Sequence, residues 1–503
     1  MARHAVTLRA RRIAVVGAGP SGLAAAKYLR AEKAFDKIVL FEHRRSSGGL
    51  WNHTPDQTSE DIFTIPQTDP KGQNQDPLWK NAAADDTAAD GKIASFLSPI
   101  YEELETNIPR GLMGFKGLDW PQNTPLFPKH RTVLEYIQDY GRDVQGLIQY
   151  ETQVINAEPT SNEPNSTWNV TVRNLRTKKV TKEIYDAIIV ASGRFTVPNV
   201  PDVPGIREWN KQYPGSITHS KYYRRPVDFA NKKVVVVGNA ASGADISDQI
   251  ANHCQTPLIW SARSFSPFSA NAAKDPRRKV YGALKRFLPS TRSVEMEDGT
   301  IIEDVDAILF ATGYFYSLPF LEHVKPALIT DGSHVENTYQ HLFYAPQPTL
   351  SFLVLNQRIV PFPIAEAQSA VLARVYSGRL ALPSLQDMQA WHVARRAEIE
   401  SDRNFHLLLF PKDGEYINML STWALSAPPR SDLDNDGKGK IPPLWGDREF
   451  WCREHVPAIR GAFGMLEEER KKHITRIEEV GFDYEQHLKK QNGDVETDNV
   501  IAG

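Results

Sequence analysis

Cysteine is almost absent from this chain of 503 residues. Only Cys254 and Cys452 occur, far apart in the sequence and without a C-x-x-C pair. A disulfide scaffold, a cysteine-ligated metal site and a two-cysteine redox centre are therefore not expected. The sequence also shows no metal-binding motif and no nucleophilic triad, so no metal is assigned.

Charge of one sign and long apolar runs are lacking as well. The net charge is −2, so no basic field points to nucleic acid. No window approaches the roughly 18 uncharged apolar residues of a membrane span, and the basic N-terminus lacks the apolar run of a secretory signal. These absences predict a chain that works in a reducing, aqueous compartment, with a cytoplasmic location and neither a nucleic-acid nor a membrane partner.

A glycine-rich turn near the N-terminus is the first positive signal. Residues 12–17 (RIAVVG) predict a buried strand, residues 23–32 (LAAAKYLRAE) a helix and residues 37–42 (KIVLFE) a second strand. A G-x-G-x-x-G motif needs this context, because its glycines permit a tight turn, close approach of a pyrophosphate and close helix packing. The helix N-terminus then offers free N–H groups and partial positive charge to phosphates. The residues assigned to this first unit are Gly17, Ala18, Gly19, Pro20, Ser21 and Gly22.

A second unit of the same kind occupies residues 232–251 (KKVVVVGNAASGADISDQIA). Its turn has Ala240 where the middle glycine of the motif would stand, and this methyl group narrows the room for a pyrophosphate. The strand–turn–helix context is otherwise complete, so a second dinucleotide site is predicted. The residues assigned to it are Gly238, Ser242, Gly243, Ala244 and Asp245.

The residue near the end of the second strand differs between the two units. Glu42 lies 20 residues after Gly22, and Arg263 lies 20 residues after Gly243. A carboxylate suits the hydroxyl groups of an unphosphorylated ribose, whereas an arginine suits a 2′-phosphate. The comparison assigns FAD to the first unit and NADPH to the second. Two further candidates for the phosphate are Arg224 and Arg225.

Small residues follow several buried strands, where a chain can pass close to a nucleotide. Paired glycines in SSGGLW, residues 46–51, suggest backbone packed against a flat or phosphorylated ligand. Trp51 fits either a place along a flavin or a core aromatic. The strands at residues 186–193 and 301–313 both end in small residues. The residues assigned to these places are Gly49, Leu50, Trp51, Ser192, Gly193, Thr312 and Gly313.

Two stretches are ambiguous from the residues alone. Residues 98–115 begin with a helical pattern (IYEELE) and break at Asn107, two residues before Pro109, so a helix-ending asparagine is the simplest interpretation. Residues 67–93 carry few large apolar side chains and predict an exposed, flexible insertion without its own core.

The order of the elements predicts an α/β protein with two Rossmann-like dinucleotide-binding domains, the second inserted in the first, and a mainly helical C-terminal region. We expect the FAD-binding domain at residues 1–212 and the NADPH-binding domain at residues 213–334. Residues 335–503 should complete the FAD-binding domain and add the helical region, which ends in a charged amphipathic helix over residues 465–480.

The segment YPGSITHSKYY, residues 213–223, joins the two units and carries a family resemblance. It is similar to the fingerprint F-x-G-x-x-x-H-x-x-x-F/Y of the flavin-containing monooxygenases, with tyrosine as its first aromatic. The matching positions are Tyr213, Gly215, His219 and Tyr223. Further segments that resemble the family are G-G-L-W (48–51), T-N-x-P (106–109) and F-A-T-G-Y (310–314). The resemblance covers most of the chain, whose length looks like that of the soluble fungal or microbial members.

The resemblance implies an NADPH-dependent flavoprotein monooxygenase. Such an enzyme holds FAD and NADP and inserts one oxygen atom of O2 into an amine nitrogen or a sulfur atom through a C4a-hydroperoxyflavin. The resemblance gives Asn107 the catalytic role of stabilising that intermediate together with NADP⁺, and it places Thr106 and Asn107 beside the cofactors. It also lets Tyr223 border the NADPH site, whereas a structural role is expected for His219.

Three alternatives stay open. Baeyer–Villiger enzymes, which oxygenate ketones, look similar, but their fingerprint ends in Trp followed by Pro or Asp, whereas here Tyr223 is followed by Arg224. A disulfide or quinone reductase would use the same two units and would need a redox cysteine pair. A non-catalytic flavoprotein would keep the fold, and Ala240 is the one hint of it. The substrate and a homo-oligomeric state also stay open.

Overall fold

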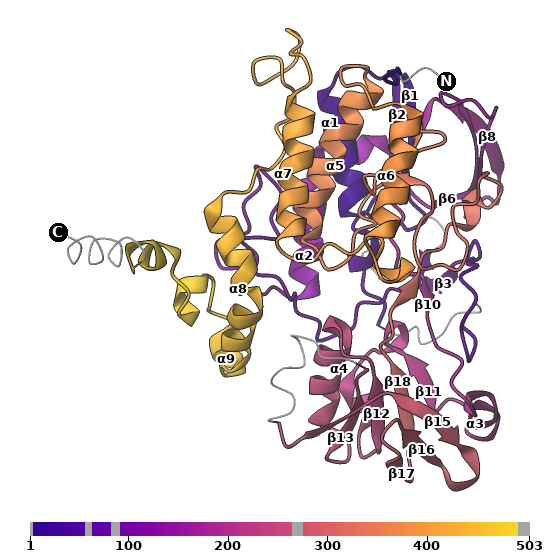
Figure 1. Ribbon diagram of the computed structural model, residues 1–503, viewed down its shortest axis with the longest axis vertical. Coiled ribbons are helices and arrows are strands. Elements are labelled where there is room, and N and C mark those ends of the chain that lie inside the picture. The colour runs from indigo at the N-terminus through magenta and orange to yellow at the C-terminus, as the bar shows by residue number, and fades with distance from the viewer. Residues whose placement is uncertain (1–3, 56–62, 82–90, 264–274, 491–503) are drawn as a thin grey trace.

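The computed structural model describes residues 4–55, 63–81, 91–263 and 275–490, which form two lobes (Figure 1). The larger lobe, at the top of the view, combines the N-terminal part of the chain with the helices that follow residue 360. The middle of the chain builds the smaller lobe below it. The predicted α/β class is therefore confirmed, with a second Rossmann-like unit inserted in the first and a helical C-terminal region.

A seven-stranded sheet forms the centre of the larger lobe. Its strand order is β20-β21-β22-β9-β1-β2-β5, and the strands from β22 to β5 run parallel. The central strands read RIAVV and AIIV, because a parallel strand covered on both faces needs apolar side chains on both. The strands are β1 (Arg12–Val16), β2 (Lys37–Phe41), β5 (Ile148–Gln149), β9 (Ala187–Val190), β20 (Thr338–Tyr339), β21 (Phe343–Tyr344) and β22 (Leu350–Phe352).

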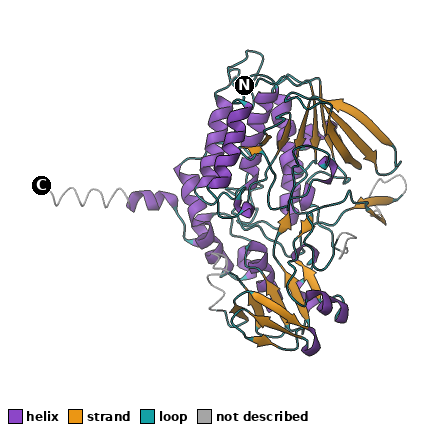
Figure 2. Ribbon diagram, turned by 45° about the vertical axis from the view of Figure 1, so that its right-hand side comes forward, coloured by secondary structure: helices purple, strands orange, loops and turns teal. Residues whose placement is uncertain are grey.

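Helices and an antiparallel meander pack around this sheet (Figure 2). Helix α1 packs along α5 and α5 along α7, in one apolar core with residues of α2 and α8. The meander β6-β7-β8 contributes Trp168 to a second core, which it shares with Val16 and Val39 of the sheet. These elements are α1 (Pro20–Ala31), α2 (His130–Tyr140), α5 (Pro361–Tyr376), α6 (Leu385–Ala397), α7 (Lys412–Leu425), α8 (Asp447–Gly464), β6 (Thr152–Pro159), β7 (Trp168–Asn174) and β8 (Val180–Tyr185).

The smaller lobe repeats the plan with fewer strands. Its five-stranded parallel sheet has the order β11-β18-β12-β13-β14, and a three-stranded antiparallel sheet, β15-β16-β17, lies beside it. The elements are α3 (Ile206–Gln212), β11 (Ile217–His219), β12 (Val234–Val237), α4 (Ala241–Ala251), β13 (Leu258–Ser261), β14 (Arg278–Tyr281), β15 (Leu284–Leu288), β16 (Ser293–Met296), β17 (Ile301–Ile302) and β18 (Ala307–Phe310).

The chain crosses between the lobes twice, at adjacent places. Strand β10 (Val197–Pro198) leads into the smaller lobe, β19 (Tyr314–Phe315) leads back, and the two pair antiparallel. Packing changes at these strands: α3 lies in the core of the smaller lobe, whereas residues 316–328 contribute to the core of the larger one. The packing thus favours domain boundaries at β10 and β19 over the expected ones after residues 212 and 334.

Residues 98–105, where the sequence shows a helical pattern, form turns without a helix. The carbonyl groups of Ser98 and Ile100 accept hydrogen bonds from the Arg224 guanidinium, at 3.0 and 2.7 Å. In a helix these carbonyl groups would accept hydrogen bonds from backbone N–H groups four residues later. The hydrogen bonds from Arg224 take the place of those helical hydrogen bonds.

The described part of the predicted insertion at 67–93 is anchored to both lobes, and in the smaller lobe Gln67 N donates to the Val200 carbonyl at 3.0 Å. The Gly72 N–H donates to Ser317 Oγ at 2.8 Å, and β3 (Leu78–Asn81) pairs with β4 (Lys92–Ser95). Trp79 of β3 packs on a small apolar cluster that includes Phe96. Residues 82–90 lie outside the described residues. Most of the described ones are exposed, and the cluster beside Trp79 is formed by residues outside the segment, so the expected lack of a core of its own stays a prediction.

The charged helix predicted at 465–480 is reduced to α9 (Glu468–Lys471). The Ile474 carbonyl accepts from Leu126 N at 2.7 Å and the Thr475 carbonyl from Arg110 Nε at 3.1 Å, so these groups serve the larger lobe instead of a helix. In the described part of the chain, no helix has the length and apolar character needed to cross a membrane.

Candidate dinucleotide sites and the brace between them

The first glycine turn is shaped by backbone contacts that leave no room for a side chain. Gly17 has φ +104°, and a Cβ there would stand 2.6 Å from the Ala191 carbonyl oxygen. A Cβ on Gly22 would stand 2.0 Å from the Gly17 carbonyl oxygen. Helix α1 begins with Pro20, whose missing N–H costs nothing there, and no side chain caps this end. The turn therefore presents free helix N–H groups beside Ala18 and Ser21.

A second glycine turn lies directly on the first. The Gly48 N–H donates to the Ala18 carbonyl at 3.0 Å, and a Cβ on Gly49 would meet Gly19 Cα at 3.0 Å. Gly49 begins a 3-10 turn, Gly49–Trp51, in which Leu50 offers its carbonyl to Ser98 Oγ. Trp51 is half-buried and packs on the main core of the larger lobe, which favours the core-aromatic interpretation.

Glu42 stands where β2 ends and is almost fully buried. Its Oε2 accepts from Ala18 N at 2.8 Å and its Oε1 from Arg44 N at 2.9 Å. Burial raises the pKa of Glu42, and these N–H groups oppose the rise. A carboxylate is thereby fixed beside the glycine turn, within reach of a bound ribose.

The turn of the second unit has nearly the same geometry. Gly238 has φ +110°, with a would-be Cβ 2.5 Å from the Ala311 carbonyl oxygen, and a Cβ on Gly243 would stand 2.1 Å from the Gly238 carbonyl oxygen. The cap residue Ala240 has φ −74° and ψ −175°, against −74° and −176° for Gly19. Ala240 is exposed, so its methyl group does not disturb the backbone shape. The remaining residues assigned here, Ser242 and Ala244, lie in the first turn of α4.

Arg263 does not occupy the place of Glu42, although the two spacings are equal. Gly17 N bonds to the Phe41 carbonyl and Gly238 N to the Ser261 carbonyl, so Ala262 corresponds to Glu42. The chain from glycine to strand end is one residue shorter in the second unit, and Arg263 falls one place further on, where it is exposed. This place is compatible with the predicted 2′-phosphate contact, because the phosphate extends beyond the ribose and Ala262 stands where the first unit has Glu42.

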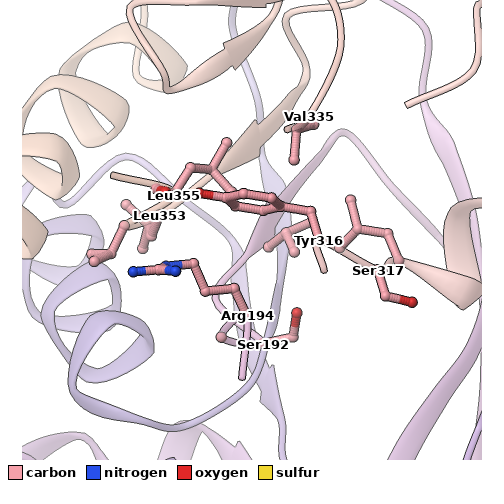
Figure 3. Close-up of a pocket in the computed structure, with 11 residues that line it drawn as sticks. Ser192, Arg194, Tyr316, Ser317, Val335, Leu353 and Leu355 are labelled. Carbon is pink, nitrogen blue, oxygen red and sulfur yellow. Dashed lines mark hydrogen bonds between the residues drawn. The ribbon is translucent and has the colours of Figure 1, made fainter. Parts of the chain in front are cut away.

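The small residues after the other strands lie at the same sheet edges. Ser192 and Gly193 follow β9 and line a pocket with Arg194 and Tyr316 (Figure 3). The Arg194 guanidinium carbon lies 5.9 Å from the centroid of the Tyr316 ring, and Tyr316 donates to the Leu355 carbonyl.

Thr312 and Gly313 follow β18 and face the crossing strands. Thr312 Oγ1 donates to the Asn199 carbonyl, and Asn199 N donates back to the Gly313 carbonyl at 2.9 Å. Gly313 has φ +81°. These two residues therefore close the crossing of the chain between the lobes.

The segment after Tyr213 braces the two lobes, and its key residues are buried. His219 Nδ1 accepts from Lys221 N at 3.1 Å, which leaves Nε2–H to donate to the Gly313 carbonyl at 3.0 Å. Burial lowers the pKa of His219 to about 3, so the imidazole is neutral. Lys221 Nζ donates to the Thr196 carbonyl at 2.6 Å, just before β10. The structural role expected for His219 thus has named partners.

Arg224 is a buried clamp and not a phosphate ligand. It is 3% exposed, and its guanidinium donates to the carbonyls of Thr54, Ser98 and Ile100 in the larger lobe. Arg225 is exposed and pairs with Asp228 at 3.2 Å. Neither the burial nor the clamp role of Arg224 could be foreseen, because a pair of arginines looks the same in sequence whichever one is buried.

Tyr223 and Asp245 lie in a polar contact between the lobes. Tyr223 is 1% exposed and its hydroxyl donates to Gln249 Oε1 at 2.9 Å, which indicates packing on α4 rather than contact with a cofactor. Tyr101 of the larger lobe donates to Asp245 Oδ2, to which Gln249 Nε2 also donates at 3.1 Å. Burial raises the pKa of Asp245 to about 6, and the Tyr101 hydrogen bond opposes the rise. Sequence reasoning missed Tyr101, which follows no recognisable motif.

Asn107 lies on an irregular segment held from both sides. Thr106 is buried, with its N–H on the Pro128 carbonyl at 3.1 Å and its Oγ1 on the Ile108 carbonyl at 3.0 Å. Glu105 forms an ion pair with Arg460 of α8 at 3.1 Å. Asn107 itself is exposed, so its amide is free to meet a ligand while its neighbours fix the backbone.

Both glycine turns fit a dinucleotide. Each combines a helix N-terminus that no side chain caps with a glycine turn in which a Cβ would clash with the backbone, and we call this arrangement a cradle. It is the arrangement that accepts a pyrophosphate. Beyond the strand end the first unit has a buried carboxylate, Glu42, and the second an exposed arginine, Arg263.

Comparisons with known proteins agree with this geometry. A sequence model described as flavin-binding monooxygenase-like matches residues 71–268 and 279–430, and one for an NAD(P)-binding Rossmann-like domain matches residues 15–66. The flavin-containing monooxygenase FMO GS-OX3 of Arabidopsis thaliana is 34% identical over 82% of this chain and 84% of its own length. The flavin-containing monooxygenase iboF of Amanita muscaria is 29% identical over 82% and 88%. The solved structure of S-allyl-L-cysteine S-oxygenase from Allium sativum has a TM-score of 0.72 and 26% identity, over 97% of this chain and 99% of that one.

Proposed function

The chain belongs to the flavin-containing monooxygenase family, and we propose that it transfers one oxygen atom of O2 to a soft nucleophile, a sulfur or an amine nitrogen. As a member of this family it is a monooxygenase that uses FAD and NADP and acts on small molecules. The observation that carries the proposal is the pair of matching glycine cradles, braced against each other by one buried segment.

Each cradle is proposed to hold one cofactor. Gly17–Gly22 and Glu42 would hold FAD, and Gly238–Gly243 with Arg263 would hold NADPH. When bound, FAD supplies the redox chemistry through which NADPH and O2 are used. The residues of the chain bind and orient the two dinucleotides and keep water from the place where they meet.

The brace sets how the two cofactors face each other. His219 and Lys221 hold the strands on which the chain crosses between lobes, and Arg224 holds three carbonyl groups of the larger lobe. Small changes in orientation cost large factors in rate, because a reaction between bound partners depends on their alignment. Asn107, on the segment that Tyr101 ties to α4, would offer its side-chain amide as a hydrogen-bonding group to the two cofactors where they meet.

Sulfur is favoured over nitrogen by the overall likeness to the S-allyl-L-cysteine S-oxygenase, which extends over nearly the whole of both chains. Oxygenation of a ketone is the second candidate. It is disfavoured because the fingerprint of the ketone-oxygenating enzymes ends in Trp followed by Pro or Asp, whereas here Tyr223 is followed by Arg224. A disulfide reductase would need paired thiols, but Cys254 and Cys452 belong to different core clusters.

A substrate panel tests the proposed reaction. FAD-loaded protein is given NADPH and, in turn, a thioether, a tertiary amine and a cyclic ketone, and the oxygenated product is measured per NADPH consumed. We expect sulfoxide as the main product and a smaller yield of amine oxide. Lactone as the sole product would replace the proposal with ketone oxygenation, and NADPH consumption without any oxygenated product would remove it.

The role of Asn107 is tested by the fate of O2. Asn107→Ala should leave FAD content unchanged and raise hydrogen peroxide release per NADPH about tenfold, because a hydrogen bond to a charged or strongly polar group contributes about 1.5 kcal/mol or more. Asn210→Ala, on α3, is the matched control and should change nothing. Equal peroxide release in parent and Asn107→Ala would remove the role given to this residue.

A further inference from the structure

A buried cluster of two histidines and a glutamate lies outside the cofactor sites. His334 and Glu336 follow β19 in the segment that re-enters the larger lobe, and His392 comes from α6, which Figure 1 labels in that lobe. The two imidazoles are 1% and 7% exposed, and Phe405 packs 4.8 Å from each of them, measured between ring centroids. Nothing in the proposed oxygenation uses these residues.

The polar atoms of the cluster converge on one place. Glu336 Oε2 lies 3.2 Å from His334 Nε2 and 3.7 Å from His392 Nε2, and one ligating atom from each residue lies within 4.8 Å of the others. His334 Nε2 is buried, and none of the described residues forms a hydrogen bond with it. At 3.2 Å from Glu336 Oε2, His334 Nε2 is close enough for both atoms to contact one shared cation.

Neighbouring hydroxyl groups fix which atoms converge. Ser333 Oγ lies 3.0 Å from His334 Nδ1, which turns Nε2 toward the cluster. Thr330 Oγ1 donates to Glu336 Oε1 at 3.1 Å, which leaves Oε2 for the two imidazoles. Histidine ligands of metals are oriented in this way, through a hydrogen bond on the nitrogen that does not touch the metal.

We propose that His334, Glu336 and His392 bind a divalent transition-metal ion of the zinc type. Two imidazoles and a carboxylate are a common zinc ligand set that leaves a fourth position for water. With metal–ligand bonds of about 2.0–2.2 Å, tetrahedral ligand atoms lie about 3.3–3.5 Å apart. The two measured contacts to Glu336 Oε2, 3.2 and 3.7 Å, bracket that range. The bound ion would tie α6 to the chain that returns from the smaller lobe.

The local charge permits a cation. Arg396 Nη1 lies 3.8 Å from Glu336 Oε2, but Asp402 holds the same guanidinium with hydrogen bonds of 2.6 and 3.0 Å. Asp402 can therefore keep Arg396 on the outer side of the cluster. The Arg396 side chain is half exposed, which places the cluster close to the protein surface.

Zinc binding is tested on the FAD-loaded protein without a histidine tag. The protein is stripped with a chelator and dialysed against zinc, its zinc content is measured per chain, and its Tm is followed as zinc is added. We expect one zinc per chain and a rise in Tm of about 2–4 °C at a zinc concentration of 100 Kd. His392→Gln and Glu336→Gln should lose the zinc and the Tm response, whereas His455→Gln on α8 should keep both. Ser333→Ala should weaken zinc binding about 10- to 100-fold.

FAD content in each variant separates loss of the metal site from loss of the fold. Variants that keep FAD and lose zinc support the site. Equal zinc content in parent, His392→Gln and Glu336→Gln overturns it, and so does a parent that retains no zinc after dialysis. In either case the three residues form an ion-pair cluster with Arg396 and no metal site.

Discussion

The two glycine turns have nearly the same backbone but different surroundings. A Cβ on Gly17 would stand 2.6 Å from the Ala191 carbonyl oxygen, and a Cβ on Gly238 would stand 2.5 Å from the Ala311 carbonyl oxygen. The φ and ψ angles of the two helix N-caps agree within a degree. Among the described residues, 264–274 being outside them, a second glycine turn lies only on the first, at Gly48 and Gly49. At the second turn Ala240 is exposed, so a methyl group fits at this position.

This contrast separates what makes a dinucleotide site from what makes it selective. The cradle is set by close packing of a helix on a strand, and it recurs wherever those elements meet at this distance. Selectivity comes from the residues beyond the strand end. There the first unit has a buried carboxylate, Glu42, and the second has Ala262 followed by an exposed arginine, Arg263.

The largest effect is expected when a methyl group is added inside each glycine turn. Gly22→Ala and Gly243→Ala would place a methyl carbon 2.0 and 2.1 Å from the preceding glycine carbonyl, so helix and strand must part. Overpacking of this kind costs about 1–3 kcal/mol, and an equal loss of binding free energy would lower affinity about 5- to 150-fold. We expect Gly22→Ala to lose FAD, and Gly243→Ala to keep FAD while its KM for NADPH rises. Flavin absorbance per chain and NADPH oxidation rates measure the two effects.

Gly19→Ala is the matched control, because its Cβ would meet Gly49 Cα at an ordinary 3.5 Å. It should bind FAD better than Gly22→Ala. If Gly243→Ala lost FAD and Gly22→Ala kept it, the assignment of the cofactors to the two units would be reversed.

The sequence was sufficient for the cradles and insufficient for the brace. Strand, glycine spacing and helix are local patterns, so both units and the inserted architecture could be predicted. Arg224 and Tyr101 act across the lobes, and their partners are carbonyl groups and a carboxylate far along the chain. The cluster of His334, Glu336 and His392 could not be predicted for the same reason, because the packing of α6 brings His392 to Glu336.

Equal spacing in sequence also misled at one place. Equal spacing from the glycine turn pairs Arg263 with Glu42, but the strand register shows that Ala262 is the counterpart. One residue fewer between turn and strand end shifts the arginine outward. Counting residues from a motif therefore locates the strand-end residue to within about one position, whereas the hydrogen bonds of the strand identify the equivalent residue.

The arginine gives the second test, with a smaller expected effect. Arg263→Ala should raise the KM for NADPH about 10- to 100-fold and leave that for NADH nearly unchanged, because a charge-assisted hydrogen bond to a phosphate contributes about 1.5–3 kcal/mol. Steady-state kinetics with both nucleotides measure the split. Arg225→Ala, in which an exposed arginine paired with Asp228 is removed, should alter neither value. An equal rise for NADPH and NADH would show that Arg263 does not contact the 2′-phosphate.

The smallest expected effect is a change in stability with pH at the helix turn that follows each cradle. Two residues after the last glycine of the turn, α1 has the buried Ala24 and α4 has Asp245. Burial raises the pKa of Asp245 to about 6, so the ionised form is disfavoured in the folded protein. This costs stability above pH 6, and the cost disappears as the pH falls through about 6 toward the pKa of an unfolded aspartate.

Asp245→Asn keeps an acceptor for Tyr101 and removes the charge, so Tm should rise by a few degrees at pH 8 and by progressively less below pH 6. Thermal unfolding of both proteins from pH 5 to pH 8 measures the difference. Ser242→Ala, on the same turn but exposed, should give a difference that does not change with pH. If Asp245→Asn instead lowered Tm most at pH 8, the ionised carboxylate would be stabilising, and the contact with Tyr101 would be a charge-assisted bond between the lobes rather than a burial cost.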